Sequence, residues 1–394
     1  MNIAFVTPEF VTEIGYDGGL ANYLYKISKS LIKRGHNIYI IVISEDDEIF
    51  LYEDINVIRV THKSYVLRIY QKLFFGKFYA PVKWLVQSQK LNNALKKLNA
   101  KITLDIVQFA SMEATGFFAS SVVPKVGRIS SYKPLNENAY ERKMGFVTKT
   151  LNYLEMMALK KMDGVFGPSK ITANIVSQKI QKPVKVIESP VFQKNTYNIQ
   201  VYNDSLKDKK YLLFFGSLSL LKGIKEIGDI IYKVLSEFPD IFFVFVGKDR
   251  GDLLGKPMMD YIWRKAAEKR GRCLFLGSME QEFLQPIIAK STAVVLPSRM
   301  DNFPNTCIEA MLLGKIVIGT DGASYEQLIE DGRNGYLCKI KDPFSLLQSI
   351  RKVLSLDEEE KRKISKNAQS TVKRLSPTII AEEMEYYYKE IISE

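Results

Sequence analysis

The chain has 394 residues, of which 46% are hydrophobic and 25% charged, and its formal net charge is +12. This composition excludes global disorder, and the length favours two domains over a single core. Three scattered cysteines and two histidines offer little material for a disulfide framework, a zinc site or a catalytic triad. No apolar run approaches the roughly 20 residues that a membrane-spanning helix needs, and we expect no secretory signal.

The first half of the chain opens with a strand, a loop, a helix and a second strand. Residues 3–7 are short, apolar and β-branched, residues 20–31 have helical spacing, and residues 38–43 form another apolar run. The loop before the helix contains Gly18 and Gly19, whose lack of a side chain lets the backbone come close to a ligand. Such βαβ units predict a parallel sheet covered by helices.

The same pattern restarts near residue 211, which indicates a second domain of the same kind. Strands are predicted at 211–215, 241–246, 273–276, 293–296 and 316–318. The predicted α/β fold is therefore two doubly wound domains facing across a cleft, with ligands beyond the carboxyl ends of the strands. We expect an N-terminal domain at 1–188, a polar linker at 189–210, a C-terminal domain at 211–375, and a helix at 376–394 that packs back on the first domain.

The segment after the strand at 293–296 carries the most informative residues. We expect a helix to begin near Thr306 with Asn305 as its N-cap, and the unpaired amides of its first turn suit a diphosphate. Asp301 and Glu309 flank these amides, and carboxylates accept hydrogen bonds from sugar or ribose hydroxyls. In the plain alternative, Asp301 is a turn residue and Glu309 is a solvated helix residue.

A second loop, from Gly216 to Gly223, follows the first strand of the second domain. Its Lys222 lies where a cation could meet a phosphate, although a surface lysine on an ordinary loop is an equal alternative. The pattern G-x-x-x-x-G-K-S/T is absent, which excludes the usual nucleoside-triphosphate loop. No strand is followed by G-x-G-x-x-G, so a dinucleotide cofactor is not indicated.

These motifs resemble the retaining glycosyltransferases of family four, which have the GT-B fold. The acidic E-x7-E motif of that family corresponds to Asp301 through Glu309, in the context Pro297-Ser298, Asn302-Phe303-Pro304 and Glu309-Ala310-Met311. Its G-R-L-x-x-x-K-G motif corresponds to Gly216-Ser217-Leu218 through Lys222-Gly223. Its glycine-rich start corresponds to Gly18-Gly19 and Gly35-His36, so that the resemblance spans nearly the whole chain.

The resemblance implies a role for each matching residue. Lys222 would neutralise the leaving diphosphate and Asp301 would hold hydroxyls of the donor sugar, which makes these the two catalytic residues. The donor-binding residues would be Gly18, Gly19, Ser217, Met279, Asn302, Phe303, Pro304, Asn305, Thr306 and Glu309. No metal and no cofactor is implied, and the donor would be a nucleotide-diphosphate sugar.

Three departures from the family pattern bear on activity. Asp301 is one methylene shorter than the usual glutamate. Ser217 replaces an arginine that normally accompanies the lysine, for which Arg299 or Arg128 could substitute. A first-domain histidine common in the family is missing, because the matching stretch carries Gln108.

The resemblance implies hexosyl transfer with retained anomeric configuration, in the synthesis of bacterial cell-surface polysaccharide or glycolipid. Two alternatives fit the same motifs. One is a weakly active or inactive subunit that binds a sugar nucleotide, and the other is a sugar-nucleotide epimerase with the GT-B fold.

The positive charge of the chain is concentrated in its first half. Residues 1–190 hold 26 Lys and Arg against 16 Asp and Glu, and residues 62–101 hold nine Lys and Arg, seven aromatics and no acid. This mixture favours peripheral contact with an anionic membrane, beside a glycan or lipid-linked acceptor, while a helical pair with inward aromatics is the alternative. No nucleic-acid motif accompanies it, so we expect no nucleic-acid partner. We expect a cytoplasmic protein that can work at the inner face of the cell membrane.

Overall fold

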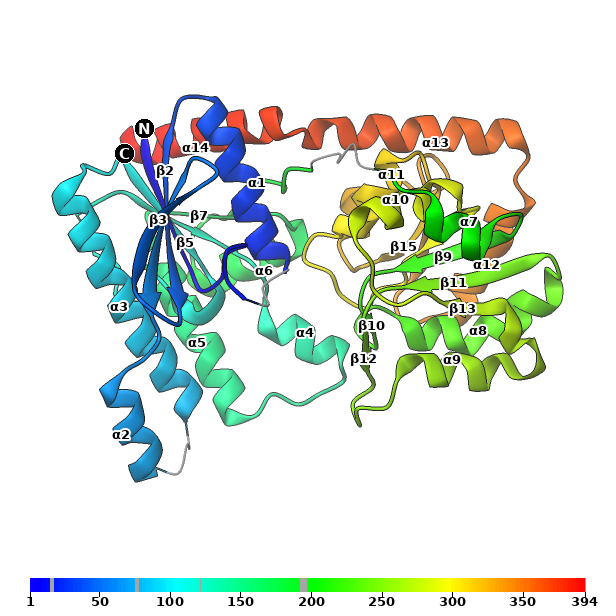
Figure 1. Ribbon diagram of the computed structural model, residues 1–394, viewed down its shortest axis with the longest axis horizontal. Helices are drawn as coiled ribbons and strands as arrows, with labels where there is room; N and C mark the ends of the chain where they lie inside the picture. Colours follow the sequence, from blue (N-terminus) through cyan, green and yellow to red (C-terminus); the bar gives the residue numbers. More distant parts are fainter. Residues whose placement is uncertain (15–17, 75–77, 121, 192–196, 394) are drawn as a thin grey trace. The chain divides into compact units, whose positions relative to one another are not determined.

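The computed structural model describes residues 1–14, 18–74, 78–120, 122–191 and 197–393. The chain divides into two compact units (Figure 1). Unit 1 comprises residues 1–138, 142–190 and 375–394, and unit 2 comprises residues 139–141 and 191–374. Each unit contains a parallel sheet and helices that pack on it, which confirms the predicted α/β fold class.

Unit 1 is built on an eight-stranded sheet with the strand order β3-β4-β2-β1-β5-β6-β7-β8. Neighbours pair in parallel except β3, which forms an antiparallel hairpin with β4 at one edge. Every residue of β5 is buried, because helices cover both faces of the central strands, and this explains the unbroken apolar runs in the sequence. The strands are β1 (Asn2–Thr7), β2 (Asn37–Ser44), β3 (Glu48–Tyr52), β4 (Ile55–Thr61), β5 (Ile106–Ala110), β6 (Lys125–Arg128), β7 (Gly164–Gly167) and β8 (Lys185–Val186).

The helices of unit 1 include one from the far end of the chain. Helix α14 packs beside α1 (Figure 1), where the hydroxyl of Tyr388 donates to Gln108 Oε1 at 2.7 Å and Arg34 pairs with Glu385 at 2.8 Å. The helices are α1 (Gly19–Lys33), α2 (Tyr65–Phe74), α3 (Tyr79–Lys101), α4 (Lys133–Ala139), α5 (Phe146–Lys160), α6 (Lys170–Ile180) and α14 (Pro377–Ser393). Within the described part of the chain, no helix is both long and apolar enough to cross a bilayer.

Unit 2 is built on a six-stranded parallel sheet with the order β13-β11-β9-β14-β15-β16. A separate pair of short strands, β10 and β12, lies beyond its carboxyl edge. The strands are β9 (Lys210–Phe215), β10 (Leu218–Ser219), β11 (Ile241–Val246), β12 (Asp249–Gly251), β13 (Cys273–Phe275), β14 (Ala293–Val295), β15 (Val317–Asp321) and β16 (Tyr336–Lys339).

The helices of unit 2 begin earlier in the chain than the sequence predicts. Residues 200–206 fall inside the range predicted as a linker, but they form α7, which packs on α10. The sequence pattern did not indicate this helix, because α7 is short and polar, and it is held by this contact rather than by a wide apolar face. The helices are α7 (Gln200–Leu206), α8 (Ile224–Glu237), α9 (Met258–Ala266), α10 (Gln281–Lys290), α11 (Asn305–Leu312), α12 (Pro343–Ser355) and α13 (Glu358–Val372).

Candidate functional site

The segment between β14 and α11 follows the carboxyl end of a central strand of unit 2. Helix α11 begins at Asn305, and Pro304 at the N-cap position supplies no side-chain hydrogen bond to the first turn. The prediction that Asn305 is the N-cap is therefore wrong, because its own backbone is already helical. The first turn contains no acidic residue, so no carboxylate of that turn offsets the positive end of the helix dipole.

Lys222 and Asp301, the two predicted catalytic residues, are in contact. The Lys222 ammonium and Asp301 Oδ2 form an ion pair, although 79 positions separate the two residues in the sequence. The side chains are 27% and 14% exposed, respectively. A partly exposed ion pair of this kind contributes little stability, so a charged ligand can compete for either partner.

The negative charge of Asp301 also reaches buried side chains behind the loop. Burial raises the pKa of the Cys307 thiol above its ordinary value, and the charge of Asp301 raises it further. The same two causes, in the same order, raise the pKa of the Tyr325 hydroxyl. Both groups therefore stay protonated and neutral near pH 7.

A glycine brings the two loops together. Gly223 has φ of +77°, and a Cβ atom added there would lie 1.9 Å from the carbonyl oxygen of Pro297. The backbone N–H of Arg299 donates to the carbonyl of Leu221 at 2.8 Å across the same contact. The loop that carries Lys222 thus packs backbone to backbone on the loop that carries Asp301.

Glycines also end the strands beside this contact. Gly216 follows β9, has φ of +128°, and a Cβ atom there would lie 3.7 Å from Thr306 Cγ2. A Cβ atom on Gly247, which follows β11, would lie 1.9 Å from the carbonyl oxygen of Gly216. The N–H of Gly247 donates in turn to the carbonyl of Gly277 at 2.8 Å. The ends of β9, β11 and β13 therefore form one continuous backbone surface beside the start of α11.

The other predicted donor-binding residues of unit 2 lie on these loops and on α11. Ser217 follows Gly216, and Met279, half-buried, lies on the loop between β13 and α10. Glu309 is half-buried in the second turn of α11. The residues at the start of the helix are Asn302 and Thr306, which are half-buried, Phe303 and Pro304, which are buried, and Asn305, which is exposed.

Gly18 and Gly19 belong to unit 1, whereas the other predicted donor-binding residues belong to unit 2. Gly18 stands at the N-cap of α1, and Gly19 is its first residue. The carboxylate of Glu9 accepts a hydrogen bond from the N–H of Ala21 at 3.2 Å, and a Cβ atom on Gly18 would lie 3.2 Å from the same oxygen. A carboxylate therefore caps this helix, which the glycine pattern did not reveal.

The two arginines that could substitute at Ser217 are both buried and contact other groups. Arg299 is buried and its guanidinium binds the carboxylate of Glu226 at 2.7 and 2.8 Å. Arg128 belongs to unit 1, where it is buried against the ring of Tyr23 at 3.6 Å from its centroid. The expectation that one of them replaces the missing arginine is not supported by these contacts.

Two supporting contacts escaped the sequence analysis. The Arg299–Glu226 ion pair lies under the Asp301 loop, and the hydroxyls of Ser298 and Tyr325 are 3.0 Å apart in the core. Glu226 lies four positions after Lys222 in the first turn of α8, where a buried acid is unusual. The position of Glu226 close to Lys222 in the sequence was one indication that it lies near the site. Nothing near Tyr325 in the sequence indicates that it contacts Ser298.

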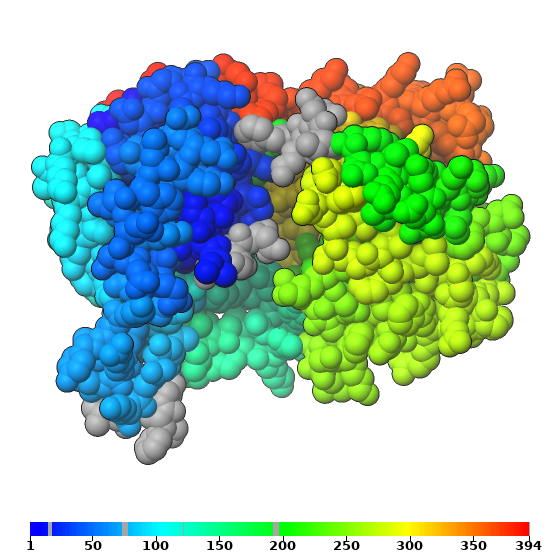
Figure 2. Space-filling model, viewed as in Figure 1, coloured from blue at the N-terminus to red at the C-terminus, as the bar shows by residue number. Residues whose placement is uncertain are grey.

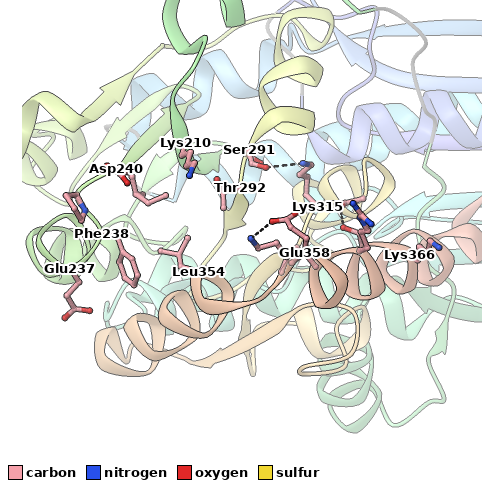
Figure 3. A pocket seen from close by; sticks show the side chains of 17 residues that line it. Lys210, Glu237, Phe238, Asp240, Ser291, Thr292, Lys315, Leu354, Glu358 and Lys366 are labelled. Carbon is pink, nitrogen blue, oxygen red and sulfur yellow. Dashed lines mark hydrogen bonds and ion pairs between the residues drawn. The ribbon is translucent and has the colours of Figure 1, made fainter.

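A cavity of about 710 Å³ lies at the opposite edge of the unit 2 sheet (Figure 3). Lys210 begins β9 and Thr292 precedes β14, so this cavity lies at the amino ends of the strands. The ammonium of Lys315 donates to the carbonyl of Ser291, directly after α10, at 3.1 Å. Cations here offset the negative ends of helices that finish at this edge, which is a structural role.

The described residues contain no group of three or more His, Cys, Asp or Glu side chains that could hold a metal ion. The charged groups of the candidate site are instead a lysine, an aspartate and a glutamate around an uncapped helix start. Such an arrangement can bind a diphosphate at the helix and lysine, and hydroxyl groups at the carboxylates.

Two family models match the chain. The model described as Glycosyltransferase Family 4 matches residues 17–191, and the model described as Glycosyl transferases group 1 matches residues 198–371. An uncharacterized glycosyltransferase of Methanocaldococcus jannaschii is 24% identical over 376 residues, which are 90% of this chain and 89% of that protein.

Two further similarities cover different shares of the chain. Spore coat protein SA of Bacillus subtilis is 26% identical over 160 residues, 40% of this chain, so the match spans only 42% of that relative. The crystal structure of the Anabaena protein HepE in complex with UDP has a TM-score of 0.72 at 18% identity, and the match covers 99% of this chain and 100% of that chain. At this identity, the likeness shows the fold alone. The two family models together match nearly the whole of the present chain. This chain therefore belongs to glycosyltransferase family 4.

Proposed function

We propose that this protein transfers a hexose from a nucleoside-diphosphate sugar to a hydroxyl group of an acceptor. The observation that carries the proposal is the contact between Lys222 and Asp301 beside the uncapped start of α11. A cation, a carboxylate and the first turn of a helix are groups that a diphosphate and a sugar would need, and their proximity supports the proposal. HepE, which has the same fold, was crystallised with UDP, and this supports a uridine nucleotide as the first donor to test.

In the proposed reaction, Lys222 and the start of α11 stabilise the negative charge that grows on the departing diphosphate. Electrostatic stabilisation by preorganised groups is often the largest single contribution to catalysis. The Lys222 ammonium exchanges Asp301 for a phosphate oxygen when the donor binds. Asp301 then accepts hydrogen bonds from the hydroxyls of the donor sugar.

The nucleoside is held through α11. Glu309 lies in the second turn, about one turn beyond the amides proposed to bind phosphate. Its carboxylate accepts hydrogen bonds from the two ribose hydroxyls, and Met279 lies against the base. The main-chain amides from Phe303 to Thr306 face the sugar and the diphosphate.

We propose that transfer retains the anomeric configuration. A donor phosphate oxygen can take the acceptor proton on the same face from which the sugar leaves, so no histidine base is needed. Gln108, at the position where family members often carry a histidine, is buried and accepts from Tyr388, which suits a structural role. Proton NMR of the first product formed would show the anomeric configuration directly.

A thermal-shift screen tests donor binding before any acceptor is known. A ligand that binds only the folded state raises stability by about 2.7 kcal/mol at 100 times its Kd, so a UDP-, GDP- or ADP-sugar that binds should raise Tm. We expect the shift to shrink in Lys222→Ala and in Glu309→Ala. A shift that neither substitution changes would contradict the proposed site.

We also propose that unit 1 contacts an anionic membrane near α2. In the segment 62–101, Tyr65 is 77% exposed on α2, whereas Trp84 is buried, so the aromatics divide between surface and core. Helix α2 projects from unit 1 (Figure 2). Residues 75–77 of the segment lie outside the described residues.

The start of α5 extends this surface. Phe146 is 70% exposed, and its ring contacts that of Phe78 with centroids 5.5 Å apart. Residues 142–154 add three Lys and Arg and no acid to the nine cations of residues 62–101. Exposed rings among cations suit the boundary of an anionic bilayer, where a lipid-linked acceptor of a surface polysaccharide would be found.

Vesicle co-sedimentation tests this membrane surface. We expect the wild-type protein to sediment with vesicles that contain phosphatidylglycerol and not with pure phosphatidylcholine vesicles. The double variant Tyr65→Ser with Phe146→Ser should lose most of this binding. Phe344→Ser serves as control, because Phe344 is 63% exposed in unit 2, and equal loss in the control would contradict the proposal.

A further inference from the structure

A short piece of the chain from within the sequence of unit 1 is part of unit 2. Residues 139–141 belong to unit 2, although residues 138 and 142 on either side of them belong to unit 1. We call residues 139–141 the inserted segment. It comprises Ala139, the last residue of α4, and the two residues that follow this helix. Its contacts within unit 2 show what it does there.

The inserted segment completes the hydrogen bonding of Arg299 in unit 2. The Nε and Nη2 atoms of Arg299 both bind Glu226 Oε1, at 2.8 and 2.7 Å. Its Nη1 atom donates to the carbonyl oxygen of Ala139 and to Glu141 Oε1, both at 3.3 Å. The Arg299 side chain is only 6% exposed, and a buried donor without an acceptor is unfavourable. Arg299 therefore depends on the inserted segment as well as on Glu226.

Charge attraction holds the end of the inserted segment in place. Glu141 Oε1 lies 3.2 Å from Lys341 Nζ and 3.3 Å from Arg299 Nη1. The hydrogen bond from Lys341 lowers the pKa of the Glu141 carboxyl, and the charges of Lys341 and Arg299 lower it further. The charge of Lys225, on α8, acts in the same direction. Three cations from separate parts of unit 2 thus surround one carboxylate.

The backbone of Glu141 is also strained. Glu141 has φ of +59°, in the left-handed region that a residue other than glycine adopts at a cost. Such a conformation persists where the surrounding contacts impose it. The contacts that impose it here are those of the Glu141 carboxylate with Lys341 and Arg299.

Arg299 connects the inserted segment to both loops of the candidate site. Its backbone N–H donates to the carbonyl of Leu221, beside Lys222, at 2.8 Å. Asp301 follows Arg299 by two residues in the same loop. A displacement of Arg299 is therefore transmitted through a short stretch of backbone to the Asp301 carboxylate. A misplacement of about 1 Å in a catalytic group can reduce a rate by about 10²-fold.

We propose that Glu141 is a positioning residue, which holds Arg299 and thereby fixes Asp301 in the geometry that sugar transfer requires. Loss of its charge leaves the Nη1 group of Arg299 weakly held and allows the Asp301 loop, residues 297–304, to move. The proposal rests on the transferase function proposed above and adds a further residue to it. Glu141 acts through Arg299, so we expect it to affect turnover and not the binding of the nucleotide.

Hydrogen exchange measured by mass spectrometry tests this positioning without any substrate. We expect Glu141→Gln to speed exchange of the amides of residues 298–303 by at least about threefold, because a contact that opposes local opening is lost. The buried strand β9 should exchange as in wild type, which shows that the variant is folded. Glu359→Gln makes the same chemical change on an exposed residue of α13 and should change neither region. Identical exchange in Glu141→Gln and wild type would overturn the proposal.

Steady-state kinetics with an active donor test the consequence for catalysis. We expect Glu141→Gln to lower kcat by at least about fivefold, while the Kd for UDP changes by less than about twofold. Glu141→Lys should be less active still, and adding Lys341→Glu should restore at least about twofold of the loss, because the ion pair re-forms with reversed charges. A charge-reversed pair that restores nothing, or a parallel loss of UDP binding, would contradict the positioning role.

The two readouts separate this proposal from the proposed function. If Glu141→Gln changes the exchange of residues 298–303 but the wild type transfers no sugar, the proposed function fails and the contact through Arg299 stands. If the wild type is active and the kcat of Glu141→Gln equals that of wild type, the positioning role alone fails.

Discussion

Lys222 and Asp301 form an ion pair at the candidate site of unit 2, so their opposite charges offset each other. Each side chain neutralises the other, and Ser217 adds no charge where family members often have an arginine. Under the proposed function, a donor diphosphate must therefore take Lys222 from Asp301.

Replacing Asp301 by asparagine should separate binding of the nucleotide from transfer of the sugar. Asp301→Asn frees the Lys222 ammonium for phosphate, so we expect UDP to bind as tightly as before or more tightly. Turnover should fall by at least about tenfold, because a charged hydrogen bond to the sugar is lost. Calorimetric UDP titration and steady-state kinetics measure the two effects, and weaker UDP binding by this variant would count against the exchange.

The buried Arg299–Glu226 pair supports the Asp301 loop without entering the reaction. Removing one partner of a buried pair typically costs about 3–5 kcal/mol, because the other charge is left uncompensated. We expect Arg299→Met to lower the urea midpoint of unit 2 strongly, and Arg299→Met with Glu226→Leu to recover much of the loss. If the double variant is no more stable than Arg299→Met alone, the pair does not act in this way.

The residues of the candidate site could be predicted only in part from the sequence. Asp301, Glu309 and Lys222 stand out because charged residues at fixed spacing follow apolar strands. The contact of Arg299 with Glu226 depends on how two loops pack, and 73 positions separate the residues. Nothing local could have shown that this arginine is already bound.

At the scale of elements, the strands were the most predictable feature and the polar connections the least. Strands such as 241–246 are apolar because both faces are buried, so their runs are visible in the sequence. The short helix α7 has no wide apolar face, and α11 begins one residue before its expected start because Pro304 takes the N-cap position. Both differences arise from packing and backbone geometry that hydrophobic periodicity does not record.

The conformation of the loop that carries Lys222 depends on Gly223. A matched pair of glycine substitutions can test this dependence. In Gly223→Ala, the new Cβ would meet the Pro297 carbonyl, so the loop must move and Lys222 with it. We expect a clear drop in Tm and at least about a tenfold loss of kcat/KM. Gly255→Ala is the control: its φ of +78° is nearly the same, but a Cβ atom there meets nothing within 4 Å.

The control should lose only the roughly 1 kcal/mol that the left-handed conformation costs an alanine. Circular dichroism melting and donor kinetics on both variants compare the two losses. Similar behaviour of the two variants would show that conformational cost alone, and not the close approach to Pro297, explains the glycine.

At the scale of the whole molecule, a buried carboxyl group makes stability depend on pH. Glu155 in unit 1 is 2% exposed, and burial raises its pKa to about 7, against the opposing effect of Lys133 at 3.4 Å. The folded state therefore binds a proton more tightly than the unfolded state. The stabilisation is complete below about pH 4.5 and is lost as pH rises towards 7.

Urea unfolding of wild type and Glu155→Gln at several pH values between 4.5 and 8 measures this effect. We expect stability of the wild type to fall by about 1–3 kcal/mol relative to the variant across this range. In Glu155→Gln, stability still falls with rising pH, but less steeply, because the pKa of Glu113 is also raised. Glu385, with a pKa lowered to about 2, affects stability only at lower pH. Parallel curves for the two proteins would contradict the assignment.

The central claim is that Lys222 stabilises the departing diphosphate, and the most direct measurement is the turnover of a donor that the thermal-shift screen identifies. Lys222→Ala should lower kcat/KM by about 10²–10³, the usual loss when one preorganised electrostatic donor is removed. Lys225→Ala is the matched control, because this lysine lies one turn away and pairs with Asp229 on the helix surface. The account predicts wild-type turnover for Lys225→Ala, and equal turnover of Lys222→Ala and wild type would contradict it.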